Sequence, residues 1–223
     1  LFKQNLPFKL TNAQERTIKE ISDDISLTKP MRRLVQGDVG SGKTVVAAVS
    51  MYISAKNNTQ SVLLCPTEVL AEQHFKNFSA WFKNSNIKIE LLTGKMPVSK
   101  RRGIYQDLED GVIDILIGTH AVFQDKVKMK NLGLVVVDEQ QRFGVKQRFD
   151  LVKKSSDQIM PHQLFMTATP IPRTLAMTIF ADLETSKIDE LPPGRKPVET
   201  LVYSDKKKDE IVKRLETVCK SGN

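Results

Sequence analysis

Short apolar runs alternate along the chain with segments that are long enough to form helices. Most of these runs are continuously apolar, which is typical of strands that are covered on both faces. Because strands that alternate with helices build parallel sheets, the pattern predicts an α/β fold with a mostly parallel central sheet and helices on both faces. The predicted strands are Leu34–Gln36, Ser61–Cys65, Ile87–Leu92, Ile113–Gly118, Leu134–Val137 and Gln163–Met166.

The C-terminal part departs from this alternation. Its proline-rich stretch Leu191–Pro197 predicts an extended, stiff connector. A strand candidate at Val198–Tyr203 and a charged helix from Asp205 to Cys219 follow it. We therefore expect residues 1–190 to form one domain and residues 191–223 to be a linker with the start of a second domain. The chain does not begin with Met, so we expect a fragment of a longer protein.

The composition, with 40% hydrophobic and 27% charged residues, is ordinary for a soluble globular protein. No stretch approaches the roughly 18 apolar residues of a membrane helix, and the N-terminus lacks the layout of a signal peptide. We therefore expect a cytoplasmic protein with no membrane partner. The net charge of +8 favours a polyanion such as nucleic acid as a partner. The two cysteines, Cys65 and Cys219, have neither metal-ligand nor redox spacing.

A glycine-rich sequence between a predicted strand and a helix-length segment matches the phosphate-binding pattern G-x-x-x-x-G-K-[ST] without a mismatch. Its glycines allow the backbone to approach a phosphate closely, and successive N–H groups point at the anion from a helix N-terminus. Lys43 is expected to reach the β- and γ-phosphates of ATP, and the hydroxyl of Thr44 to bind Mg²⁺. The predicted ATP-binding residues of this loop are Gly37, Asp38, Val39, Gly40, Ser41, Gly42, Lys43 and Thr44.

Two acidic residues, Asp138 and Glu139, follow the apolar strand Leu134–Val137. A parallel sheet delivers the carboxyl ends of its strands to the edge at which ligands bind. Asp138 there can hold Mg²⁺, directly or through water, and Glu139 can polarise the attacking water. Acids at a strand end are also common as helix caps, but a phosphate loop upstream favours the catalytic interpretation. The predicted catalytic residues are Lys43, Asp138 and Glu139.

These motifs resemble the superfamily 2 helicases, in which Asp138–Gln141 would be the DExx box. The resemblance narrows to the RecG-type helicases of bacteria and covers nearly the whole chain. It implies a RecA-like P-loop fold and an ATP-dependent helicase or translocase that acts on branched DNA, such as replication forks and recombination intermediates. It also implies ATP and Mg²⁺ as cofactors, and a second motor domain and a wedge domain in the full-length chain. The segments that carry it are Gly37–Thr44, Asp138–Val145, Thr167–Leu175 and Leu191–Arg195.

The resemblance assigns Gln14 to adenine recognition, through two hydrogen bonds from its amide. The residues also allow a capping box, in which Thr11 caps a helix and Gln14 reaches back to it. Phe8 either stacks on the base or staples the same helix.

Residues that follow other predicted strands resemble the backbone-contacting motifs of the family. A single strand of DNA would lie across them, held through its phosphates. For the run Lys100–Arg102, DNA contact and a solvent-facing position remain alternatives, whereas Lys206–Lys208 is expected to face solvent. His74 and His162 are expected at the surface. The predicted DNA-binding residues are Pro66, Thr67, Thr93, Gly94, Thr119 and His120.

Coupling between the ATP and DNA sites is assigned to Gln141, Arg142, Thr167 and Thr169 by the same resemblance. The chain departs from the family at Gln141, where RecG-type proteins usually carry histidine. Glutamine can donate and accept hydrogen bonds but cannot become cationic.

Two other functions remain open at this point. The motor of a transcription-repair coupling factor is similar, and a nucleotide-gated DNA-binding module would need no productive hydrolysis. No segment after Asp205 resembles the arginine-bearing motif that a second motor domain supplies. We therefore expect this chain alone to bind nucleotide but to hydrolyse it slowly, and not to unwind DNA.

Overall fold

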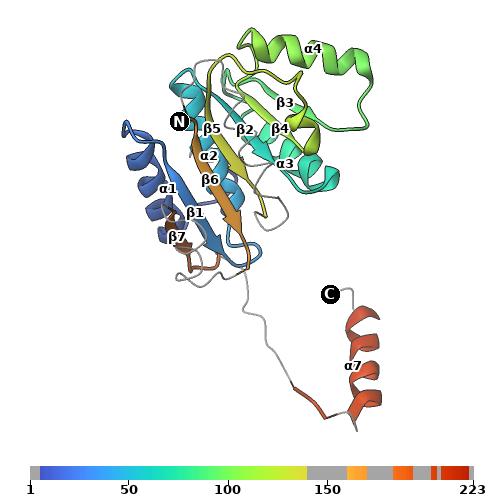
Figure 1. Ribbon diagram of the computed structural model, residues 1–223. Coiled ribbons are helices and arrows are strands. Elements are labelled where there is room, and N and C mark those ends of the chain that lie inside the picture. The colour runs from blue at the N-terminus through green and yellow to red at the C-terminus, as the bar shows by residue number, and fades with distance from the viewer. Residues whose placement is uncertain (1–5, 140–159, 170–182, 193–201, 205–206, 221–223) are drawn as a thin grey trace. The chain divides into compact units, whose positions relative to one another are not determined.

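The computed structural model describes residues 6–139, 160–169, 183–192, 202–204 and 207–220 (Figure 1). The chain divides into two compact units, Leu1–Pro193 and Gly194–Asn223. The first unit holds the sheet, and the second holds the helix α7 (Lys208–Lys220). The strand candidate at 198–203 falls mostly outside the described residues, and its described end forms no strand. Across the described ranges, no helix is long and apolar enough to cross a membrane.

Seven strands form one sheet in the order β3-β4-β2-β5-β6-β1-β7, and every neighbouring pair is parallel. All six predicted strands are present, and the predicted parallel α/β fold is confirmed. The strands are β1 (Arg32–Gly37), β2 (Gln60–Leu64), β3 (Ile89–Leu92), β4 (Ile115–Gly118), β5 (Leu132–Val137), β6 (His162–Thr167) and β7 (Glu184–Ile188).

Both faces of the sheet are buried, because neighbouring residues of a strand point to opposite sides. In β5, Leu134 and Val136 pack into one core with α1, α2 and α3, while Val135 and Val137 pack into another with α4 (Figure 1). This two-sided burial explains why the central strands are continuously apolar. The helices are α1 (Asn12–Ile25), α2 (Lys43–Lys56), α3 (Glu68–Trp81) and α4 (Val98–Glu109), with a short 3₁₀ helix η2 at His120–Phe123.

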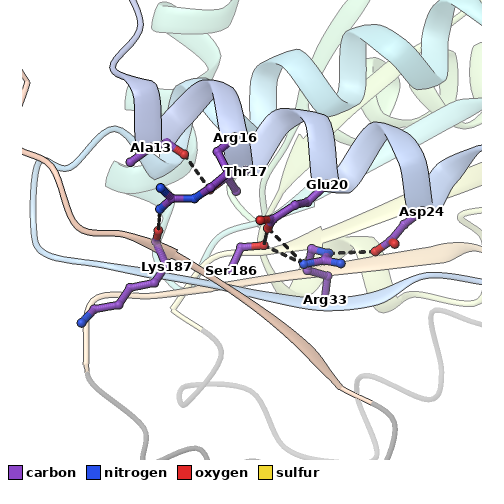
Figure 2. A network of polar contacts seen from close by, with 8 residues as sticks. All are labelled: Ala13, Arg16, Thr17, Glu20, Asp24, Arg33, Ser186 and Lys187. Carbon is purple, nitrogen blue, oxygen red and sulfur yellow. Dashed lines mark hydrogen bonds and ion pairs between the residues drawn. The ribbon is translucent and has the colours of Figure 1, made fainter.

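The edge strand β7 was not predicted from the sequence, because three of its five residues are exposed and polar. Polar contacts with α1 hold it in place (Figure 2). Arg33 on β1, only 8% exposed, donates to Ser186 of β7 at 2.7 Å and to Asp24 of α1 at 2.8 Å. Arg16 of α1 donates to the carbonyl of Lys187 at 3.0 Å. The strand therefore depends on hydrogen bonds and ion pairs where the central strands depend on apolar burial.

His162 at the start of β6 is partly buried, contrary to the expectation of a surface position. Its Nδ1 accepts a hydrogen bond from the backbone N–H of Met31 at 2.9 Å. Burial lowers the pKa of His162, against a smaller opposing effect of Asp24. A protonated ring cannot accept this bond, so the contact between the starts of β1 and β6 requires a neutral imidazole.

Acid should weaken this contact. Because the folded-state pKa of His162 is lowered, its stabilisation is present above the unfolded value of about 6.5 and is lost as the pH falls through the folded value. The Oδ1 atom of asparagine can accept the same bond without titrating. Between about pH 7.5 and about pH 5, we expect the original chain to lose on the order of 1 kcal/mol more stability than His162→Asn. Thermal unfolding at the two pH values measures this, and equal losses would contradict it.

Candidate active site

Apart from Gln14 on α1, the predicted site residues that the structure describes lie at one edge of the sheet, because all seven strands run parallel and end there. The order of the strands separates them into two groups. The ends of β1, β6 and β5, which are neighbours, lead into the phosphate loop, Thr169 and the Asp138-Glu139 pair. The ends of β2, β4 and β3, also neighbours, lead into the predicted DNA-binding residues.

The phosphate loop has the backbone conformation that its glycines allow. Gly40 and Gly42 have φ values of 77° and 89°, in the left-handed region that favours glycine. Gly42 also caps the N-terminus of α2, and no side chain caps it. A Cβ atom at Gly42 would lie 2.2 Å from Nε2 of Gln14, so a larger residue is excluded by space as well as by conformation.

Lys43 links the loop with the acidic residues. It is 9% exposed, and its Nζ donates to the carbonyl oxygens of Gly37 at 2.6 Å and Asp38 at 2.9 Å. Burial lowers the pKa of Lys43, while the carboxylates of Glu139, Asp138 and Asp38 act in the opposite direction. The ammonium group therefore lies within electrostatic reach of both predicted catalytic acids.

Asp138 is 8% exposed, and its N–H donates to the carbonyl of Leu64 at 2.9 Å, which fixes it against the end of β2. Its Oδ2 lies 2.9 Å from Nε2 of His74 on α3. The expectation that His74 lies at the surface is wrong, because it is 6% exposed. Ala71, His74 and Phe78 are the buried residues of α3, and this helical spacing could have placed the histidine inside.

The backbone of Glu139 has a φ of 51°. The left-handed region is uncommon for residues other than glycine, and such conformations cluster at functional sites. The extended backbone of β5 has therefore ended by Glu139, directly after the metal-binding candidate Asp138.

The available oxygen donors suit Mg²⁺. The hydroxyl of Thr44 and the carboxylate of Asp138 are hard ligands of the kind that this ion prefers. In the part of the chain that the structure describes, no group of three or more His, Cys, Asp or Glu could hold a metal. Mg²⁺ usually takes one or two carboxylates from a protein and its remaining ligands from water and nucleotide phosphates.

A cavity of about 590 Å³ adjoins the phosphate loop and is lined by Phe8, Gln14, Gly40, Thr44 and Trp81, among others. The capping box is present: Thr11 accepts from the N–H of Gln14, and Oε1 of Gln14 accepts from the N–H of Thr11 at 3.0 Å. Nε2 of Gln14 donates to the carbonyl of Ser41 at 2.8 Å. Gln14 thus joins the helix cap to the phosphate loop at the wall of this cavity.

Phe8 and Trp81 form an aromatic corner of the same cavity. Their rings are 6.0 Å apart and nearly perpendicular, and Phe8 is 43% exposed. A flat base could therefore lie against an open aromatic face beside the loop.

The second group of predicted residues lines a shallow cavity of about 390 Å³. Thr67 caps α3 there, its hydroxyl accepting from the N–H of Leu70 at 3.3 Å. Glu68, which was not predicted, also lines the cavity and pairs with Lys95 at 2.9 Å. Thr93 is 6% exposed and is not among the lining residues. The predicted residues that the cavity brings together are Pro66, Thr67, Gly94, Thr119 and His120.

Residues 11–178 match the family model of the DEAD/DEAH box helicases. The chain belongs to this helicase family. It is 51% identical over 220 residues to the ATP-dependent DNA helicase RecG of Aquifex aeolicus (strain VF5), covering 99% of this chain and 28% of that protein. The RecG of Haemophilus influenzae (strain ATCC 51907 / DSM 11121 / KW20 / Rd) is 50% identical over 219 residues, covering 98% of this chain and 32% of that protein.

A solved structure of RecG bound to a three-way DNA junction is also similar to this helicase chain. It has a TM-score of 0.86 and 41% sequence identity, and the match covers all of this chain (100%) and 29% of that one. The chain therefore spans about a third or less of the length of the RecG proteins that it matches.

The residues at the end of β6 are hydrogen-bonded to the end of β1 in this helicase chain. The hydroxyls of Thr167 and Thr169 lie 2.8 Å apart, and Gln36 donates to the carbonyl of Thr169 at 3.3 Å. Thr167 is fully buried, with 0% exposure. The other two predicted coupling residues, Gln141 and Arg142, lie outside the described residues.

A methyl group at Gly42 should disable the phosphate loop. In Gly42→Ala the new Cβ would collide with Gln14 and the residue would keep a strained φ, so we expect nucleotide affinity to fall by at least about 100-fold, from strain of about 3 kcal/mol. The matched control is Gly103→Ala, where nothing lies within 4 Å of the new atom in α4. This control should bind nucleotide normally and gain up to about 1 kcal/mol in stability. Binding of a fluorescent ADP analogue and thermal unfolding test both; undiminished binding by Gly42→Ala would refute the steric account.

Proposed function

We propose that this chain is the ATP-binding motor half of a RecG-type DNA helicase, which hydrolyses ATP with Mg²⁺ and uses it to move along duplex DNA at branch points. The observation that carries the proposal is that the ammonium group of Lys43 lies within electrostatic reach of the carboxylates of Asp138 and Glu139, at one edge of the sheet. The similarity to RecG proteins and to a RecG structure on a DNA junction supports the DNA substrate.

In this proposal, the backbone N–H groups of the loop Gly37–Thr44 hold the phosphates, and Lys43 neutralises their charge. Thr44 and Asp138 hold Mg²⁺, which neutralises developing negative charge when it is bound. Glu139 orients the attacking water or takes its proton. Gln14 contacts adenine, which is supported by its place in the wall of the cavity beside the loop.

DNA phosphates would lie in the second cavity, against the N-terminus of α3 and the turns at Gly94 and Thr119. Backbone N–H groups and short polar side chains contact phosphates without reading bases. The net charge of +8 favours the same partner. We therefore expect strongly salt-dependent binding with little sequence preference.

The proposal extends to a longer protein, because the chain spans only 28% and 32% of two RecG relatives. Residues 1–190 would be the first motor domain, and residues 191–223 the linker and the start of the second. The second motor domain would contribute an arginine to the γ-phosphate, and a wedge domain would recognise the branch in forks or recombination intermediates. Gln141, Arg142, Thr167 and Thr169 would couple ATP hydrolysis to movement, in a cytoplasmic enzyme.

Replacement of the general base separates a motor from a nucleotide-gated module. In Glu139→Gln of the full-length protein, we expect ATP turnover to fall by about 10²–10⁴-fold while ATP affinity stays within a few-fold. Fork unwinding should fall with turnover. Glu109→Gln, at an exposed position in the last turn of α4, is the control and should change neither. Turnover near the original rate would overturn the assignment of Glu139, and unwinding that persists without turnover would favour the module.

A negative charge in the second cavity should weaken the binding of DNA and leave the binding of nucleotide unchanged. Gly94 has room for a side chain, since its Cβ would meet only an oxygen of Glu68 at 3.6 Å. In Gly94→Asp of the full-length protein, we expect at least about tenfold weaker binding of DNA, since like charges a few ångströms apart repel by more than about 1.4 kcal/mol. Asn57→Asp, exposed at the C-cap of α2, makes the same charge change away from the cavity. Equal DNA affinity in both variants would exclude this cavity as the phosphate site.

A further inference from the structure

The contact between His74 and Asp138 has no role in the site as the sequence predicts it. The two side chains are 8% and 12% exposed, and Nε2 of His74 lies 2.9 Å from Oδ2 of Asp138. An ionised carboxylate only accepts hydrogen bonds, so Nε2 carries the proton and donates. The bond takes up one acceptor site of Oδ2, and Oδ1 of Asp138 can still bind a metal ion.

The imidazole ring is held in this orientation by its surroundings. Its centroid lies 6.3 Å from that of Phe78, one turn further along α3, with the rings inclined at 65°. Phe78 is fully buried, at 0% exposure, in the core between α3 and the sheet. Among the described residues, Nδ1 of His74 is buried and has no hydrogen-bond partner. Asp138 is thus the polar contact that fixes the ring within that part of the chain.

We propose that His74 is a positioning residue for Mg²⁺, which holds the carboxylate of Asp138 in the orientation that binds the ion directly or through water. This inference rests on the proposed ATP·Mg²⁺ site. Residues that orient a metal ligand through a hydrogen bond typically contribute about 10–100-fold to metal affinity. A free Asp138 side chain could rotate toward Lys43, whose ammonium group is within its electrostatic reach.

The helix that carries His74 also reaches the second cavity. α3 begins just after its cap Thr67, which lines that cavity. His74 follows Thr67 by seven residues, a rise of about 10 Å along a helix. One rigid element therefore contacts both the metal-binding carboxylate and the proposed phosphate site.

The test measures metal-dependent nucleotide binding, without relying on turnover. Affinity of the whole chain for a fluorescent ADP analogue is compared with Mg²⁺ and with EDTA, and Mn²⁺ occupancy is followed by electron paramagnetic resonance. In His74→Leu, which removes the donor and keeps bulk, we expect the gain in affinity from Mg²⁺ to fall by about 10–100-fold. Affinity in EDTA should change by less than about twofold, since the phosphate loop is untouched.

His74→Gln is the matched rescue, because the amide nitrogen of glutamine occupies the place of Nε2 and can donate to Oδ2. It should keep most of the gain from Mg²⁺. His74→Asn is a second variant without a donor at the position of Nε2, and it should behave like His74→Leu. If the leucine variant does not fold, His74→Asn is compared with His74→Gln instead. Equal affinities in all variants with Mg²⁺, or equal losses with Mg²⁺ and with EDTA, would overturn the positioning role.

Asp138→Asn distinguishes failure of this inference from failure of the proposed function. If the original chain gains no nucleotide affinity from Mg²⁺, the ATP·Mg²⁺ site itself is wrong. If Asp138→Asn abolishes the gain while His74→Leu retains it, only the role of His74 is wrong. If the ATP·Mg²⁺ site and the role of His74 are both right, the double variant His74→Leu/Asp138→Asn should lose no more of the affinity gained from Mg²⁺ than Asp138→Asn alone. The reason is that the two residues act on one ion.

Discussion

The parallel arrangement of all seven strands is the constraint on which the rest of the structure depends. It brings every strand end that carries a motif to one edge of the sheet, although these segments are spread over more than a hundred residues of sequence. The strand order then decides which motifs are neighbours. Because β6 lies between β1 and β5, Thr167 and Thr169 lie between the phosphate loop and the acidic pair. A different order of the same strands would keep all the motifs and lose the site.

Electrostatics at the phosphate loop depend on how little of Lys43 is exposed. Burial favours the neutral amine, and the three carboxylates of Glu139, Asp138 and Asp38 favour the cation. The loop carbonyls of Gly37 and Asp38 accept two hydrogen bonds from the ammonium group, which has three donors. A nucleotide phosphate would offer a stronger, charged acceptor at the same place. The same burial that lowers the pKa of Lys43 therefore also strengthens its interaction with a bound anion.

The sequence predicted the six apolar strands and the edge where the motifs meet, because continuous hydrophobic runs and glycine spacing are local signals. It missed β7, whose exposed residues are polar and which is held by Arg33 and α1 through long-range contacts. It also placed His74 at the surface: the spacing of Ala71, His74 and Phe78 could have indicated burial, but nothing local indicates that its partner is Asp138. Gln14 shows another case: the sequence offered a capping box and adenine contact as alternatives, and the structure shows the capping box in a side chain that also lines the cavity beside the loop. What remained hidden in each case was a contact between residues far apart along the chain.

The boundary between the two groups of motifs lies between β2 and β5, which are paired in the sheet. The N–H of Asp138 donates to Leu64 across this boundary, so the metal-binding candidate is attached to the strand that leads to Thr67. His74 crosses the same boundary from α3, which packs on one face of the sheet. Two independent hydrogen bonds thus hold Asp138. One joins its backbone to the end of β2, and the other joins its side chain to α3, the helix that begins at the proposed DNA cavity. A displacement of α3 would act on Asp138 through the side-chain bond from His74, while the backbone bond to Leu64 would keep Asp138 paired with β2.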